Sequence, residues 1–162
     1  MTYIDKHMQR TTQTIEDFEQ AAGEILQIIS EHYKQHGANN TYIICLHGDL
    51  GAGKTTMTQI IGKSLGVIET INSPTFVIKK TYQTTDDVFK KLIHMDAYRL
   101  EGEQNLDVFR LDQDFTSTNT LMIIEWPEII ESVIPKHAMH IFIEHDGEGR
   151  KITFKKTAHF PK

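Results

Sequence analysis

Eight consecutive residues carry the clearest chemistry in this chain. Gly48 to Thr55 read G-D-L-G-A-G-K-T, which fits the phosphate-binding pattern G-x-x-x-x-G-K-[ST]. The glycines allow backbone amides to approach a phosphate group closely. Lys54 is suited to place a cation on the β- and γ-phosphates, and the Thr55 hydroxyl is a hard oxygen ligand of the kind Mg²⁺ prefers. The pattern therefore predicts a P-loop for a nucleoside triphosphate bound with Mg²⁺.

The segments on either side of this loop support that interpretation. Residues 41–46 are β-branched and apolar, as expected of a buried strand. Residues 55–65 have helical spacing, and Gly66 follows as a helix C-cap. Strand, loop and helix thus follow in the order that places helix N-terminal amides against an anion.

Two carboxylates are candidates for the metal and for the reacting water. Asp96 ends the apolar run 92–96, and Glu125 ends the apolar run 121–125. Ligands of open α/β sheets collect where strands end at the carboxyl edge, and a P-loop protein needs a carboxylate there to hold Mg²⁺ directly or through water. Spacing alone does not assign which of the two contacts the metal.

The remaining pattern predicts the elements that position these groups. Thr14 and Asp17 form a capping box ahead of a long helix, whose apolar face runs from Phe18 to Tyr33 and which ends at Gly37. Further strands are expected at 76–82, 88–95, 120–124, 138–144 and 151–156, with a tip at 84–87 and short helices at 106–111 and 127–133. Residues 1–12 are predicted to be a polar arm. The order of elements predicts one α/β domain over 13–162, a three-layer P-loop NTPase-like fold with a mixed sheet and an antiparallel hairpin insertion.

Composition narrows the class of protein further. The chain has 162 residues and a formal net charge of −5, which argues against a surface built to bind polyanions. A single cysteine, Cys45, cannot form an intrachain disulfide and is expected to be a small buried side chain. The first ten residues lack the apolar core of a signal peptide, and no run reaches membrane-spanning length. We expect a cytoplasmic protein with no membrane contact.

Four sets of residues together resemble the bacterial TsaE family, also called YjeE. They are the loop at 48–55, Ser73-Pro74-Thr75-Phe76, the stretch His94-Met95-Asp96-Ala97-Tyr98-Arg99, and Glu125-Trp126-Pro127-Glu128. The resemblance covers about residues 12–157. It implies an ATPase required for N6-threonylcarbamoyladenosine at position 37 of tRNAs that read ANN codons. Such a protein acts with TsaB and TsaD to sustain their turnover, and contacts tRNA only indirectly.

The resemblance also implies roles for individual residues. Thr55 and Glu125 correspond to the Mg²⁺ ligands, and Lys54 to the phosphate-binding cation. Asp96 either orients or deprotonates the attacking water, or supports the metal through a bound water. Thr75 lies in a switch-like loop that senses the γ-phosphate, and Arg150 follows a glycine in a turn near the nucleotide. The phosphates are held by the amides of Asp49, Leu50, Gly51, Ala52, Gly53, Lys54, Thr55 and Thr56.

Several alternatives remain open at this point. A P-loop small-molecule or nucleotide kinase is the competing enzyme class, although the arginines are few and scattered and form no lid-like run. A nucleotide-gated binding module with negligible turnover is the third. Trp126 flanks the metal site or packs in the core, and Arg99 stabilises charge or pairs with Asp96. His94, in an apolar strand, is expected to be a hydrogen-bonded structural histidine. Phe18 stands where many family members have threonine.

Overall fold

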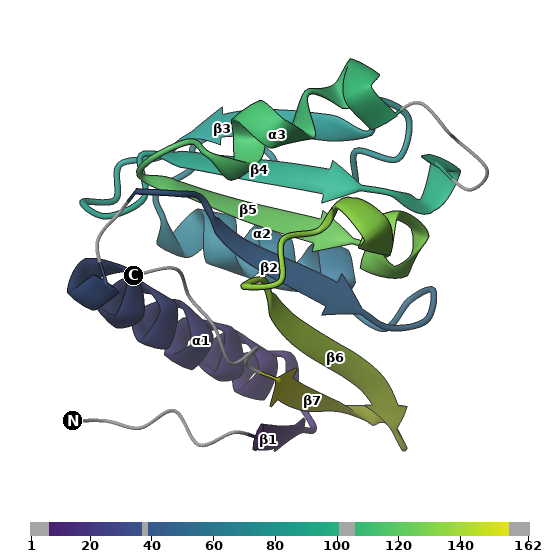
Figure 1. The fold of residues 1–162 in the computed structure, drawn as a ribbon. Helices are drawn as coiled ribbons and strands as arrows, with labels where there is room; N and C mark the ends of the chain where they lie inside the picture. Colours follow the sequence, from purple (N-terminus) through teal and green to yellow (C-terminus); the bar gives the residue numbers. More distant parts are fainter. Residues whose placement is uncertain (1–6, 37–38, 101–105, 156–162) are drawn as a thin grey trace.

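A seven-stranded mixed sheet forms the centre of the molecule (Figure 1). The computed structural model describes residues 7–36, 39–100 and 106–155. The sheet has the order β1-β7-β6-β2-β5-β4-β3. Its central strands β6, β2, β5 and β4 run parallel, while β3 and the pair β7 and β1 add antiparallel edges. The strands are β1 (His7–Thr12), β2 (Tyr42–His47), β3 (Lys79–Gln83), β4 (Lys91–Asp96), β5 (Thr120–Glu125), β6 (Met139–Asp146) and β7 (Gly149–Lys155).

Helices cover both faces of the sheet. Side chains of α1 (Ile15–His36) and α2 (Lys54–Ser64) share one core with alternate residues of β2, including Ile44 and Leu46. Ile43 and Cys45 of the same strand point to the second core, under α3 (Leu111–Phe115) and the 3₁₀ helices η1 (Tyr98–Leu100), η2 (Leu106–Phe109) and η3 (Pro127–Val133). A strand buried on both faces reads as a continuous apolar run, which is why 41–46 and 120–124 were recognisable in the sequence. The three-layer α/β architecture is confirmed.

The start of α1 is held by the predicted capping box. The Asp17 amide donates to Thr14 Oγ1 over 3.1 Å, and the Asp17 carboxylate accepts from the amides of Gln13 and Thr14 over 2.9 and 3.0 Å. These amide donors lower the pKa of Asp17. The cap fixes where α1 begins, and therefore where its first turn meets the phosphate-binding loop. The predicted helix end at Gly37 lies outside the described residues.

Most of the predicted elements are present, although several boundaries differ by one or two residues and the helix predicted at 106–111 is divided into η2 and α3. Three larger differences have a clear cause. Residues 7–12 form the edge strand β1 instead of belonging to an arm, because their backbone pairs with β7 along its whole length. Strand β3 begins at Lys79 instead of Phe76, since the carbonyl of Pro74 accepts from the amides of Val77 and Ile78 and Ile78 has a left-handed φ of 65°. Strand β4 begins at Lys91 instead of Val88, because the Asp86 carboxylate accepts from the Val88 and Phe89 amides.

Other expectations match closely. Strand β5 and the short helix at 127–133 have the expected bounds, although the helix is of the 3₁₀ type, and β6 and β7 form the expected second hairpin. Cys45 is a buried free thiol. Residues 1–6 and Lys156 belong to segments outside the described residues. Within the described part of the chain, no helix is both long and apolar enough to cross a membrane.

Candidate nucleotide site

The sheet register brings the predicted acidic residues to one edge. Leu46 of β2 pairs with Glu125 of β5, and Glu125 pairs with Asp96 of β4. All three strands are parallel, so their carboxyl ends meet beside the loop at 48–53 that connects β2 to α2. This is the topological reason why carboxylates distant in sequence lie next to the phosphate-binding loop.

The loop backbone depends on its glycines. Gly53 is the N-cap of α2 and has a φ of 115°, a conformation that other residues rarely adopt. A Cβ placed on it would lie 3.3 Å from Cζ of Phe18, so the aromatic ring of α1 covers the loop at this point. The amides of the first turn of α2 point toward the space enclosed by the loop, where they favour an anion.

Lys54 is held inside the loop in the structure. Lys54 is only 5% exposed, and its Nζ donates to the carbonyls of Gly48 and Asp49 over 2.5 and 2.9 Å. The same Nζ lies 4.0 Å from the ring centroid of Trp126. Burial lowers the pKa of Lys54, and the nearby carboxylates of Glu125, Glu128, Asp96 and Asp49 oppose this effect. The ammonium group thus has two loop carbonyls as its hydrogen-bond partners.

Thr55, Glu125 and His94 form a chain of hydrogen bonds. Thr55 Oγ1 donates to the two carboxylate oxygens of Glu125 over 3.0 and 3.2 Å. His94 Nε2 lies 2.7 Å from Glu125 Oε1, and both side chains are almost fully buried. His94 Nδ1 is buried with no hydrogen-bond partner among the described residues. A proton on Nε2 alone satisfies this geometry, because a proton on Nδ1 would be buried without an acceptor.

Asp96 organises the S-P-T segment. Its Oδ2 accepts from Ser73 Oγ over 3.1 Å and from Thr75 Oγ1 over 2.9 Å, and its Oδ1 accepts from the Tyr98 amide over 2.9 Å. The hydroxyl oxygens of Ser73 and Thr75 lie 2.6 Å apart. The switch-like segment is therefore tied to the carboxyl edge through Asp96.

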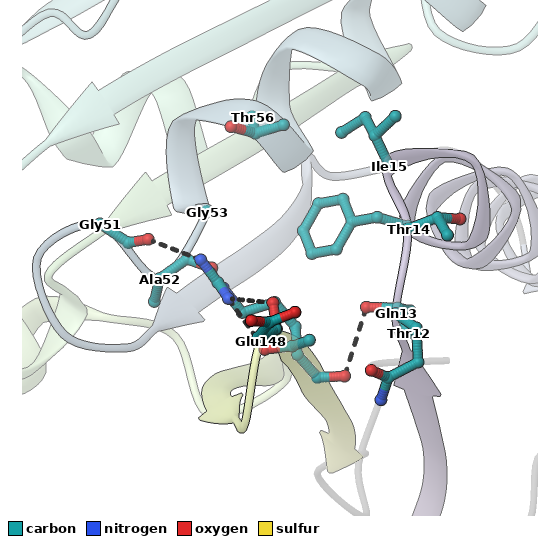
Figure 2. A pocket seen from close by; sticks show the side chains of 12 residues that line it. Thr12, Gln13, Thr14, Ile15, Gly51, Ala52, Gly53, Thr56 and Glu148 are labelled. Atoms are coloured by element: carbon teal, nitrogen blue, oxygen red, sulfur yellow. Dashed lines mark hydrogen bonds between the residues drawn. The ribbon is translucent and has the colours of Figure 1, made fainter.

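Several hollows border the loop, and two of them adjoin each other. One, of about 360 Å³, is lined by the loop, by the carboxylates of Asp96 and Glu125, and by Thr75, Tyr98 and Trp126. The other, of about 240 Å³, lies between the loop and the start of α1 (Figure 2). Gly51, Ala52 and Gly53 border it on one side, and Gln13 and Thr14 on the other. Thr56 lines both hollows, so they adjoin at the first turn of α2.

Three aromatic and two arginine side chains complete the surroundings of the loop. Trp126 has a left-handed φ of 56° and packs against Tyr98, with ring centroids 5.1 Å apart. Strained backbone of this kind is common beside functional sites. The Arg99 guanidinium lies 4.5 Å from the ring centroid of Phe76. Arg150 lines the smaller hollow and donates to the carbonyls of Gly51 and Ala52.

Most of the predicted residues line these two hollows, whereas Asp49 lines a separate one beside His47. Leu50 lines the larger hollow but its side chain is strongly exposed, and the Arg150 side chain bonds the loop itself. His94 is hydrogen-bonded, as expected, but its partner is the carboxylate of Glu125. Sequence reasoning missed that partner. One signal was present: residues two apart on a strand share a face, so His94 lies on the same face of the sheet as Asp96, whose partner in β5 is Glu125.

The parallel strands, the glycine-rich loop opening a helix and the carboxylates at the sheet edge define a P-loop-like α/β protein. Within that class the chain belongs to the TsaE family: the model of the family described as threonylcarbamoyl adenosine biosynthesis protein TsaE matches residues 12–152.

Individual relatives agree with this assignment. A Bacillus subtilis protein named tRNA threonylcarbamoyladenosine biosynthesis protein TsaE is 40% identical over 113 residues, which span 69% of this chain and 68% of that protein. Proteins of the same name from Streptomyces coelicolor and Haemophilus influenzae are 42% and 30% identical, over 53% and 68% of this chain and 57% and 67% of theirs. The crystal structure of Bacillus subtilis YdiB superposes with a TM-score of 0.69 at 26% identity, covering 97% of this chain and 90% of that one.

Proposed function

We propose that this chain is a Mg²⁺-dependent ATPase that serves the formation of N6-threonylcarbamoyladenosine at position 37 of tRNAs reading ANN codons. It acts with TsaB and TsaD in the cytoplasm to sustain their turnover, and contacts tRNA only through them. The observation that carries the proposal is the contact of Thr55 with Glu125 at 3.0 Å, beside the phosphate-binding loop.

The loop residues supply the binding of the phosphates. The amides of residues 49–56 surround the space where an anion is favoured, and Lys54 exchanges its two carbonyl partners for phosphate oxygens. The smaller hollow, beside Phe18 and Gln13, accommodates the nucleoside. This division places the phosphates at the carboxylate side and the base at the α1 side of the loop.

The donor set at the sheet edge fits a hard divalent cation. Thr55 and Glu125 present a hydroxyl and a carboxylate within hydrogen-bond distance of each other, and oxygen ligands of this kind are what Mg²⁺ requires. When bound, Mg²⁺ would neutralise charge on the β- and γ-phosphates. Asp96 lies in the next strand and orients the attacking water, while Thr75, which it binds, senses the γ-phosphate.

The decisive experiment is ATP turnover by the purified chain, alone and with cognate TsaB and TsaD. We expect slow turnover alone and strong stimulation by the pair.

Lys54→Ala should reduce hydrolysis by about 10²-fold or more, because it removes a cation from the charge that develops on the phosphate in the transition state. Lys63→Ala, at the far end of α2, is the matched control.

Two results would contradict the proposal. Unchanged turnover in the presence of the partners would argue against the coupled role and for the kinase alternative, which phosphoryl-acceptor screening would then test. Near-wild-type hydrolysis by the Lys54 variant would exclude the P-loop mechanism.

A further inference from the structure

The guanidinium group of Arg150 forms hydrogen bonds with the backbone of the phosphate-binding loop, on the side of the smaller hollow. Nε donates to the Ala52 carbonyl over 2.8 Å, and Nη2 to the Gly51 carbonyl over 3.3 Å. Nη1 donates to the carbonyls of Gly149 and Glu148 over 2.8 and 3.5 Å. Each of its three nitrogens therefore has a carbonyl partner. We infer that Arg150, although it lines the smaller hollow, is a positioning residue whose guanidinium is engaged by backbone carbonyls and holds the loop in its phosphate-binding shape.

The hydrogen bonds to these carbonyls also fix the direction of the amide groups in the same peptide units. In a trans peptide, the carbonyl and the following N–H point to opposite sides. With the Ala52 carbonyl held on the guanidinium, the Gly53 amide points away from Arg150, into the space enclosed by the loop. The next peptide back is fixed at both ends, because the Gly51 carbonyl meets Arg150 and the Ala52 amide donates to the Asp49 carbonyl over 3.1 Å.

A loop of this composition benefits from an external restraint. Gly51 and Gly53 have φ values of 77° and 115°, and glycine has no side chain that would restrict its backbone to such conformations. Ordering them costs conformational free energy each time the loop assembles around an anion. Arg150 provides that order before any ligand arrives, so binding needs less rearrangement.

The strand that carries Arg150 is held in place by its neighbours in the sheet. Its strand β7 pairs on both sides, so Arg150 lies opposite His145 of β6 and Thr12 of β1. Thr12 Oγ1 donates to the Arg150 carbonyl over 3.3 Å. A Cβ on Gly149 would lie 2.0 Å from the Thr12 carbonyl oxygen, so only glycine allows β1 this close. The edge strand and the hairpin together fix the position from which the guanidinium reaches the loop.

Arginine is suited to this task in a way that lysine is not. A planar guanidinium offers five N–H donors in a fixed arrangement and can hold two adjacent carbonyls at once, while an ammonium group is a single point charge on a flexible stem. Arg150→Lys therefore keeps the charge and removes the two-carbonyl grip. The Arg150→Lys substitution therefore distinguishes a role in positioning the loop from a role in attracting phosphate by charge alone.

The first test uses the ligand-free protein. Amide hydrogen exchange measured by NMR should show the Ala52 amide exchanging about 10-fold faster or more in Arg150→Lys, as expected when charge-assisted hydrogen bonds are lost. Amides of β2 and β5 should be unchanged, which verifies folding. Lys151→Gln, which removes a positive charge from the neighbouring position, is the control and should leave Ala52 protection as in wild type. Unchanged Ala52 exchange in Arg150→Lys would overturn the inference.

The second test separates the loop from the nucleoside, and rests on the proposed function. Arg150→Lys should weaken binding of inorganic tripolyphosphate about 10-fold or more and leave adenosine binding within about 2-fold. Equal losses for both ligands, or loss for adenosine alone, would overturn the inference in favour of a direct nucleoside contact. If wild type binds no tripolyphosphate, the proposed function fails, and the exchange measurement still decides the role of Arg150.

Discussion

The bond between His94 and Glu125 can be tested by a double-mutant cycle. His94→Leu removes the imidazole while keeping a side chain of similar size in a fully buried position, so cavity formation contributes little. The Glu125 side chain is only 4% exposed, and it would keep the Thr55 hydroxyl as its remaining partner. The variant therefore isolates the loss of one hydrogen bond to a buried carboxylate.

The magnitude follows from the burial of the pair. A hydrogen bond to a charged group contributes about 1.5–3 kcal/mol, and the charge cannot recover it from water. We expect His94→Leu to lower the free energy of unfolding by about 2 kcal/mol, which for a chain of this size lowers Tm by about 4–8 °C. Glu125→Gln removes the buried charge, so a second substitution at His94 should then cost about 1 kcal/mol less.

The assay is urea unfolding of wild type, both single variants and the double variant, in buffer free of Mg²⁺ and nucleotide. His145→Leu, at an exposed position of β6, is the control and should change stability by no more than about 0.5 kcal/mol. If the two substitutions prove additive within about 0.5 kcal/mol, the reasoning is refuted and His94 is a packing residue with no energetic link to Glu125.

Three further predictions concern other parts of the molecule. Burial, with a smaller contribution from the charge of His140, lowers the pKa of His47 from 6.5 to about 4. The unfolded chain therefore binds a proton that the folded one does not, and stability falls as the pH drops from about 6.5 toward 4. The loss attributable to His47 should be about 2 kcal/mol at pH 5, measured by urea unfolding, and a pH profile unchanged in His47→Asn would contradict this. Glu125→Ala should weaken nucleotide binding more in the presence of Mg²⁺ than in its absence, measured by calorimetry; equal losses would transfer the metal role to Asp96. The fluorescence of Trp126, the single tryptophan, should respond to Mg²⁺–nucleotide because Lys54 lies over its ring, and an unchanged spectrum would indicate a packing role alone.

Features that depend on neighbours in the chain could be predicted from the residues alone. The phosphate-binding loop is continuous over 48–55, the capping box joins residues three apart, and the strand at 120–125 is a run of apolar side chains. Each arises from short-range geometry: a turn, a helical repeat or burial on two faces. The same applies to the expectation that Asp96 and Glu125 lie at strand ends.

Strand boundaries were harder to predict, because local hydrogen bonds to a backbone carbonyl or to a side-chain carboxylate outweighed strand propensity. Phe76 and Val88 have strong strand character, yet Pro74 and Asp86 hold the following amides in turns. Residues 7–12 have a polar pattern and became a strand because β7 offered an unpaired edge. The composition of residues 7–12 gives no indication of such a partner strand.

The contacts that organise the site were decided by the tertiary structure. His94 meets Glu125 across 31 positions, and Arg150 meets Ala52 across 98. Both depend on the order of strands in the sheet, since parallel pairing of β4 with β5 creates the first contact, and the β6–β7 hairpin beside β2 creates the second. A sequence shows which side chains are available to bind phosphate and metal, but the sheet order determines which other side chains hold them in place.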